Sequence, residues 1–170
     1  MDIKKYIKDI DDFPSKGIIF RDISPLLADP KAFSHVVDSI ANKYNKRTID
    51  KIVGLDARGF IFGSVVSYKT GIPFVMVRKP GKLPDECASI DYQLEYGQNT
   101  FEIHKNSINK NDNILIIDDI LATGGSVKAV TKLIRELGAE IYALECIIEL
   151  GFLDARSELD IKINSQVVYN

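Results

Sequence analysis

The sequence has little cysteine and no long hydrophobic run. Cys87 and Cys146 lie far apart and have no CxxC motif or histidine-rich neighbour, so neither a disulfide framework nor a zinc site is predicted. The opening segment carries charges throughout, and no later stretch approaches the roughly 18 uninterrupted apolar residues of a membrane span. We therefore expect no signal peptide and no membrane partner, and we expect a cytoplasmic protein with reduced thiols.

Net charge is also small, at -2. It provides no general electrostatic reason to bind nucleic acid, so any anion site must be built locally by a few placed groups. Repeats, low-complexity segments and Gly-, Pro- or Ser-rich linkers are absent. A chain of 170 residues with 45% hydrophobic and 27% charged residues is typical of one globular domain, and we expect a single domain over residues 1–170.

Hydrophobic periodicity predicts alternating helices and strands. Apolar spacing predicts helices over 3–10 and from Pro30, the second capped by Asp29, with His35 as a solvated surface residue. The residues of 79–90 predict a loop. The remaining predicted elements are strands over 51–55, 73–78, 113–117 and 141–150, helices over 58–71 and 124–138, and an antiparallel hairpin over 91–96 and 99–105. This order predicts an α/β fold with a mostly parallel central sheet flanked by helices.

Ligands of such sheets bind beyond the carboxyl ends of the strands, which directs attention to IIDDILATGGS after the buried strand over 113–117. The small residues from Ala122 to Ser126 open a helix, whose free N–H groups and hydroxyl donors favour one phosphate group. Asp118 and Asp119 suit hydroxyls or a metal. A phosphate beside such acids describes a sugar phosphate, whereas a bare GGS would indicate only a capped helix after solvated aspartates. Neither a Walker loop nor a GxGxxG fingerprint is present.

The same segment resembles the phosphoribosyl pyrophosphate motif of the type I phosphoribosyltransferases, in which two acids precede a TGGS or TGGT turn. Four further segments, GIIFRDISPLL, GLDARGF, RKPGKLP and LEYGQ followed by FEIH, resemble adenine phosphoribosyltransferases in order and spacing. The resemblance extends from about Phe13 to about Glu149. It implies a type I fold with a small hood and a flexible β-hairpin lid over about 79–96, and a homodimer.

The resemblance also implies a role for each part of the site. The reaction would join adenine to the ribose phosphate of phosphoribosyl pyrophosphate, giving AMP and pyrophosphate in purine salvage, with Mg²⁺ bound through phosphoribosyl pyrophosphate and no metal held directly by the protein. The 5-phosphate would be bound by Ala122, Thr123, Gly124, Gly125 and Ser126, and the ribose by Asp118 and Asp119. Pyrophosphate would be bound by Asp56, Ala57, Arg58, Arg78, Lys79 and Lys82, and adenine by Ile19, Phe20, Arg21 and Ile120.

Three residues are assigned to catalysis by the same resemblance. Glu95 would manage the proton that adenine loses, while Arg58 and Lys82 would stabilise the departing pyrophosphate. Tyr96 would belong to the closing lid, which keeps water from an oxocarbenium-like centre. The structural alternative is a solvated loop charge for Lys82 and an exposed strand charge for Glu95.

Two other functions remain open at the level of sequence. A phosphoribosyltransferase for hypoxanthine, xanthine or orotate would share the phosphate site and differ in the base-binding segment. A non-catalytic regulator that senses phosphoribosyl pyrophosphate would need a nucleic-acid-binding extension, and no basic helix-turn-helix is found here.

Overall fold

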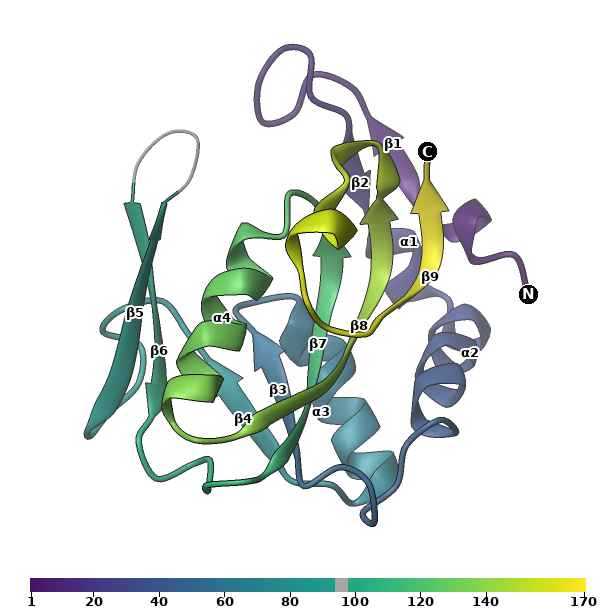
Figure 1. Ribbon diagram of the computed structural model, residues 1–170. Helices are drawn as coiled ribbons and strands as arrows, with labels where there is room; N and C mark the ends of the chain where they lie inside the picture. Colours follow the sequence, from purple (N-terminus) through teal and green to yellow (C-terminus); the bar gives the residue numbers. More distant parts are fainter. Residues whose placement is uncertain (94–97) are drawn as a thin grey trace.

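The computed structural model describes residues 1–93 and 98–170, and its centre is a five-stranded sheet (Figure 1). The strands lie in the order β4-β3-β7-β8-β9, and every neighbouring pair is parallel. The prediction of a mostly parallel sheet is therefore confirmed. The strands are β3 (Lys51–Leu55), β4 (Phe74–Val77), β7 (Asn113–Leu121), β8 (Glu140–Leu150) and β9 (Ile163–Tyr169).

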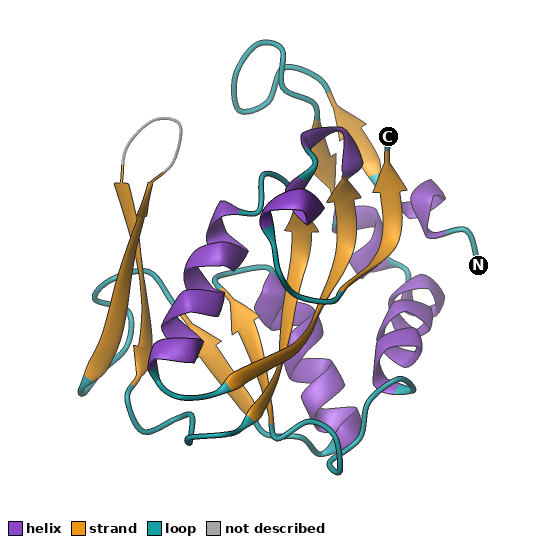
Figure 2. Ribbon diagram, in the orientation of Figure 1, coloured by secondary structure: helices purple, strands orange, loops and turns teal. Residues whose placement is uncertain are grey.

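Helices cover both faces of this sheet because its central strands alternate between two apolar cores (Figure 2). On β7, Leu115 and Ile117 face α2 (Pro30–Ala41) and α3 (Gly59–Thr70), whereas Ile114 and Ile116 face α4 (Gly125–Glu136). All four side chains are fully buried. The sequence of β7 is therefore almost continuously apolar because the strand is buried on both faces.

The helix signals of the sequence are confirmed where caps mark them. The Asp29 carboxylate accepts the N–H groups of Lys31 and Ala32 at 2.9 Å each and so begins α2. Gly71 ends α3 in the left-handed conformation, with φ 69°. His35 lies exposed on α2, as predicted.

The predicted helix over 3–10 is wrong beyond its first turn. Residues Ile3–Tyr6 form a short 3-10 helix, η1, after which β1 (Lys8–Ile10) pairs antiparallel with β2 (Phe20–Asp22). Eight residues are too few to sustain an isolated helix, and the sheet partner satisfies the backbone instead. We call residues 8–22 the hood. A short helix that was not predicted, α1 (Ser24–Ala28), follows it.

A two-stranded antiparallel hairpin is confirmed, with a different start. Its strands are β5 (Cys87–Gln93) and β6 (Gln98–His104), so β5 begins inside the predicted loop over 79–90. Ile90 and Phe101 are buried between the hairpin and α4, which explains why the strand extends further than turn chemistry indicates. Residues 94–97, which connect the two strands in the sequence, lie outside the described residues.

The C-terminal segment after β8 was not predicted. Two 3-10 helices, η2 (Gly151–Leu153) and η3 (Ala155–Glu158), lead into the edge strand β9. Their mixed composition has neither the 3.6-residue nor the 2-residue period that sequence reasoning depends on. Over residues 1–93 and 98–170, no helix has the length and apolar character needed to cross a membrane.

Candidate active site

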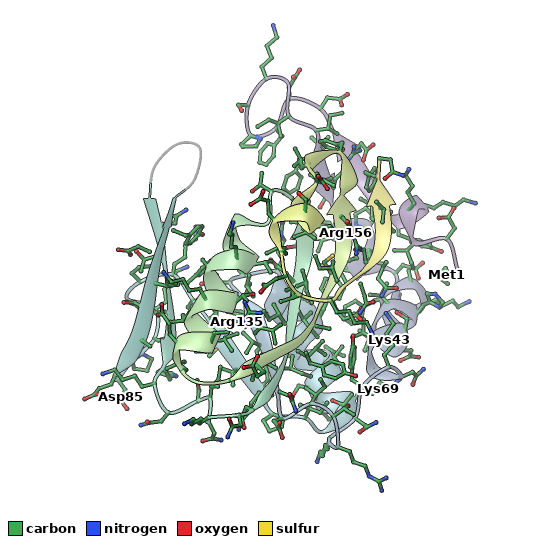
Figure 3. The ribbon with its side chains drawn as sticks, viewed as in Figure 1. Met1, Lys43, Lys69, Asp85, Arg135 and Arg156 are labelled. Atoms are coloured by element: carbon green, nitrogen blue, oxygen red, sulfur yellow. The ribbon has the colours of Figure 1, made fainter. Side chains whose placement is uncertain are left out.

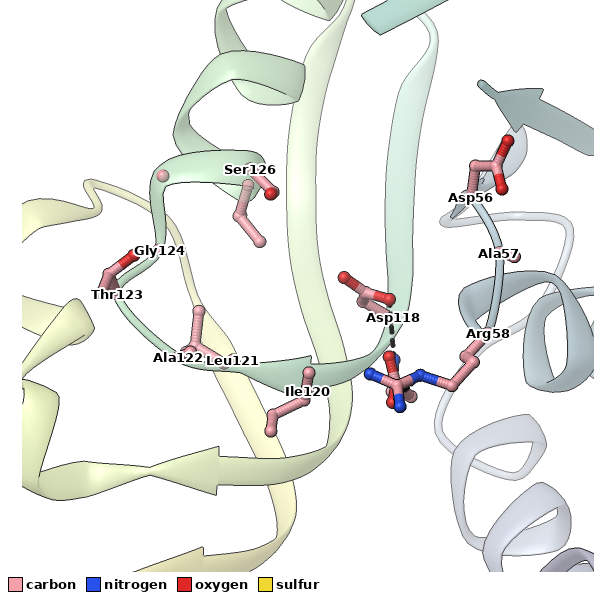
Figure 4. Close-up of a pocket in the computed structure, with 13 residues that line it drawn as sticks. Asp56, Ala57, Arg58, Asp118, Ile120, Leu121, Ala122, Thr123, Gly124 and Ser126 are labelled. Atoms are coloured by element: carbon pink, nitrogen blue, oxygen red, sulfur yellow. Dashed lines mark hydrogen bonds and ion pairs between the residues drawn. The ribbon is translucent and has the colours of Figure 1, made fainter. Parts of the chain in front are cut away.

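A cavity of about 250 Å³ opens at the carboxyl end of β7, at the place where the sequence predicts the sugar phosphate (Figure 4). The segment from Ala122 to Ser126 forms one wall, and Gly124 has a left-handed conformation, with φ 83°. Helix α4 begins at the next residue and has no side-chain cap, so its first N–H groups are free to bind an anion. The cavity is lined by residues 56–58 and 118–127.

Two carboxylates occupy the floor of this cavity. Asp119 is buried, and its backbone N–H donates to Oδ1 of Asp118 at 2.8 Å. Burial and the neighbouring charge of Asp119 raise the pKa of Asp118 well above its usual range. Burial also raises the pKa of Asp119, although the Arg58 guanidinium opposes this shift. Two acids held together in this way need hydrogen-bond donors from a ligand or a countercharge.

Arg58 supplies that countercharge. Its Nε lies 2.7 Å from Oδ2 of Asp119, and its guanidinium lies 5.2 Å from the centre of the Phe20 ring in the hood. Figure 4 shows this side chain reaching across from the end of β3 towards the acids. Arg58 therefore links the strand-end acids to the aromatic ring of the hood.

The predicted pyrophosphate residues collect around Asp56. Its Oδ2 lies 3.2 Å from Nε of Arg78 and 3.6 Å from Nζ of Lys82. Burial alone would raise the pKa of Asp56, but the hydrogen bond from Arg78 and the nearby lysines lower it below its usual range. Three predicted residues of this set, Asp56, Ala57 and Arg58, line the cavity directly, and Lys79 is exposed on the loop beside it.

A second, largely apolar cavity of about 550 Å³ adjoins the first and shares Ala122 and Thr123 with it. It is bounded by the hood and by the C-terminal segment, with Gly17, Ile18, Ile19, Arg21, Leu150, Phe152 and Leu153 in its lining. Sequence reasoning missed the last three residues. The only available signal was two adjacent large apolar residues in an irregular segment, and both proved exposed, Phe152 at 61% and Leu153 at 40%.

Three of the four predicted adenine residues line one or other of the two cavities, and Phe20 lines neither. Ile120 lines the first and Ile19 and Arg21 line the second, while the Phe20 ring meets the Phe13 ring edge-on at 5.2 Å. The Arg21 guanidinium lies 4.0 Å from the centre of the Tyr169 ring, and Arg21 also pairs with Asp9. The Arg21 side chain therefore contacts both Tyr169 and Asp9. Glu95 and Tyr96 lie outside the described residues.

Comparison with known proteins agrees with this geometry. Residues 22–164 match the family of phosphoribosyl transferase domains. An adenine phosphoribosyltransferase of Geobacter metallireducens is 51% identical over 158 residues, which cover 93% of this chain and 92% of that protein. This chain belongs to the phosphoribosyltransferase family and, within it, to the adenine phosphoribosyltransferases.

Solved structures show the same fold. The adenine phosphoribosyltransferase of Thermoanaerobacter pseudethanolicus has a TM-score of 0.93 and 45% identity and covers 98% of both chains. That of Saccharomyces cerevisiae, in complex with adenine and an imino-altritol bisphosphate, has a TM-score of 0.92 and 39% identity and covers 97% of this chain and 96% of its own. The type I phosphoribosyltransferase fold expected from the sequence is thus confirmed.

Proposed function

We propose that this protein transfers the 5-phosphoribosyl group of phosphoribosyl pyrophosphate to adenine, giving AMP and pyrophosphate, and so acts as a pentosyltransferase of purine salvage. The observation that carries this function is the pairing of two adjoining cavities. One combines a helix N-terminus with two acids, and the other is apolar and bounded by the hood. A sugar phosphate fits the first, and a flat base fits the junction with the second.

The sugar-phosphate site divides into three parts. The turn over 122–126 would bind the 5-phosphate through backbone N–H groups, and Asp118 and Asp119 would accept hydrogen bonds from the ribose hydroxyls. Arg58 pairs with Asp119 in the structure. Ribose hydroxyls that take over this carboxylate would free Arg58 to bind pyrophosphate together with Arg78, Lys79 and Lys82. Charge would thus move towards the leaving group when substrate binds.

Magnesium would bind at this site through phosphoribosyl pyrophosphate and not directly to the protein. Carboxylate oxygens at the cavity floor suit a hard cation that keeps part of its water shell, but two adjacent acids alone do not form a complete cage. Held through phosphoribosyl pyrophosphate, Mg²⁺ would neutralise the charge that develops on pyrophosphate. Asp118 and Asp119 would accept hydrogen bonds from its water ligands.

The base would be selected at the hood. Phe20 and Ile120 would contact the two faces of adenine, the carbonyl of Ile19 would accept from its exocyclic amine, and the N–H of Arg21 would donate to the adjacent ring nitrogen. Hypoxanthine mismatches both edge contacts, which favours adenine by roughly 10⁴-fold or more in specificity constant. Competition kinetics with adenine and hypoxanthine test this assignment. Use of hypoxanthine within about tenfold of adenine would favour the 6-oxopurine alternative.

Glu95 would manage the proton of adenine, with Tyr96 in a lid over about 79–96. Glu95→Gln removes the base and keeps the shape, so turnover should fall roughly a hundredfold. Glu136→Gln is the control, because Glu136 is an exposed acid at the end of α4, outside the lid, and pairs at the surface with Lys132. Equal turnover of the two variants at several pH values would remove Glu95 from the mechanism.

Lys82 would act on the leaving group. Lys82→Ala should lower turnover more than adenine affinity, because a charge-assisted contact contributes about 1.5 to 3 kcal/mol. Lys105→Ala, which removes an exposed lysine from the far end of the hairpin, is the control. Loss of adenine affinity with unchanged turnover would contradict the proposed role.

The enzyme is proposed to work as a homodimer and as a single domain over 1–170. The outer face of α3 supports a dimer: Tyr68 is 90% exposed, and Met76 of the neighbouring edge strand is 40% exposed. Tyr68→Lys should shift the mass measured by light scattering towards that of a monomer, whereas Tyr142→Lys, on β8, should not. Free cysteines at positions 87 and 146 suit the cytoplasm as its compartment.

A further inference from the structure

The C-terminal segment over 151–159 lies against the outside of the 5-phosphate turn. A Cβ placed on Gly124 would lie 3.2 Å from Cβ of Ala155 and 3.3 Å from Cδ1 of Leu159. Both of these residues are buried, so the contact is part of the packed interior. Because Gly124 directly precedes the first turn of α4, a shift of the segment would change where the turn presents its N–H groups.

Arg156 fastens this segment to the sheet. Its Nε and Nη2 donate to the two carboxylate oxygens of Glu149 at 2.6 and 2.7 Å. Its Nη1 donates to the carbonyl of Ile163 at 3.1 Å, and Nη2 also donates to Oγ of Ser165 at 3.3 Å. One guanidinium therefore joins η3, β8 and β9. Figure 3 labels Arg156 at the segment that follows β8.

The carboxylate end of this pair is sheltered from water. The Glu149 side chain is 5% exposed and that of Arg156 is 48% exposed. The hydrogen bond from Arg156 holds the pKa of Glu149 below its usual range, which is the mark of a carboxylate that is ionised and satisfied in place. If Arg156 were removed, a buried charge would remain with Ser165 as its hydrogen-bond donor, so the segment and the strand ends would have to rearrange.

We propose that Arg156 and Glu149 are positioning residues, which hold the 151–159 segment against Gly124 and thereby set the affinity of the turn for the 5-phosphate. The inference rests on the proposed function. Neither residue lines the cavity of the phosphate site, so both act through Ala155, Leu159 and Gly124 and not by contact with substrate.

The protein contains its own controls. Arg135 also joins this region to α4, with Nη1 donating to both oxygens of Asp160 at 3.0 and 2.9 Å. Its side chain and that of Asp160 are 40% and 74% exposed, and an exposed pair contributes little. The proposed pyrophosphate site provides a second control, because it lies at the end of β3 and, within residues 1–93 and 98–170, no hydrogen bond or ion pair joins it to the segment over 151–159.

The experiment measures the affinities of ribose 5-phosphate and of magnesium pyrophosphate by calorimetry for the full chain and four variants. Arg156→Gln and Glu149→Gln should weaken ribose 5-phosphate binding by about tenfold or more and change pyrophosphate binding by less than about twofold. Arg156→Lys keeps the charge but loses the planar fork, so its loss should be smaller. Arg135→Gln should retain both affinities.

Three results would overturn the inference: unchanged ribose 5-phosphate affinity in Arg156→Gln and Arg156→Lys, an equal loss for both ligands, or an equal loss in Arg135→Gln. Circular dichroism at the calorimetry temperature establishes that each variant is folded. If Arg156→Gln does not fold, Arg156→Lys takes its place in the comparison. Wild-type protein that binds neither ligand would instead refute the proposed function on which the inference rests.

Discussion

Replacing Gly124 with alanine tests the packing of the phosphate turn through a single atom. Alanine pays a backbone cost at φ 83°, which is about 1 to 2 kcal/mol for the left-handed region. Its Cβ would also meet Ala155 at 3.2 Å and Leu159 at 3.3 Å, and overpacking of a buried site costs about 1 to 3 kcal/mol. We therefore expect Gly124→Ala to lower the free energy of unfolding by roughly 2 to 5 kcal/mol.

Gly71→Ala is the matched control for the backbone cost. Gly71 also has a left-handed conformation, with φ 69°, but the atoms that its new Cβ would meet are the end of the flexible Lys46 side chain. Urea unfolding of both variants, together with KM for phosphoribosyl pyrophosphate, separates the two costs. Gly124→Ala should be the less stable and should raise KM by about tenfold or more, with KM of Gly71→Ala unchanged. Equal stability and equal KM would refute the packing argument.

Four further predictions concern the titratable groups of the site and core. Asp118→Asn should lower turnover by more than about tenfold, as should Asp119→Asn, because ribose hydroxyls prefer ionised acceptors; near wild-type kinetics in both would exclude the ribose role. Folding raises the pKa of Asp118, so the free energy of unfolding falls as pH rises from the pKa of the unfolded state, near 3.8, through the pKa of the folded state. Asp118→Asn has no such loss of stability, so its melting temperature at pH 7 should be higher than that of the wild type, by roughly 2–4 °C per kcal/mol. An unchanged or lower melting temperature would contradict this sign. Arg58→Gln removes the charge that lowers the pKa of Asp119. The pH below which phosphoribosyl pyrophosphate affinity is lost should therefore be higher in this variant than in the wild type. An unchanged pH dependence of binding would contradict the ion pair. Burial raises the pKa of Cys146 to about 12. A thiol reagent at pH 8 should therefore label Cys87 first and should label Cys146 only when the protein unfolds. Equal labelling rates for the two cysteines in native protein would contradict the burial of Cys146.

The sequence alone was sufficient to predict those parts of the fold in which a single residue or a short segment has one dominant local role. Asp29 begins α2, Gly71 ends α3, and the apolar run of β7 lies between two cores. The turn over 122–126 could be predicted as an anion site because glycines, hydroxyls and a helix start coincide there. These signals are local, and local physics determines them.

The remaining features depend on contacts between distant segments. Residues 8–10 form a strand only because β2 returns beside them, and β5 begins at Cys87 because α4 covers the hairpin. The apolar residues Phe152 and Leu153 become part of a cavity only when the hood lies opposite them. Arg58 was predicted to bind pyrophosphate, but its pairing with Asp119 depends on the register of two strands and has no sequence signal.

Product formation tests the central claim most directly. Purified protein is mixed with adenine, phosphoribosyl pyrophosphate and Mg²⁺, and nucleotides are separated by chromatography, with hypoxanthine in place of adenine in a parallel reaction. The proposed function predicts AMP and pyrophosphate in equal amounts, with inosine monophosphate formed at least about a thousandfold more slowly. Absence of AMP, or equal rates with the two bases, would contradict it.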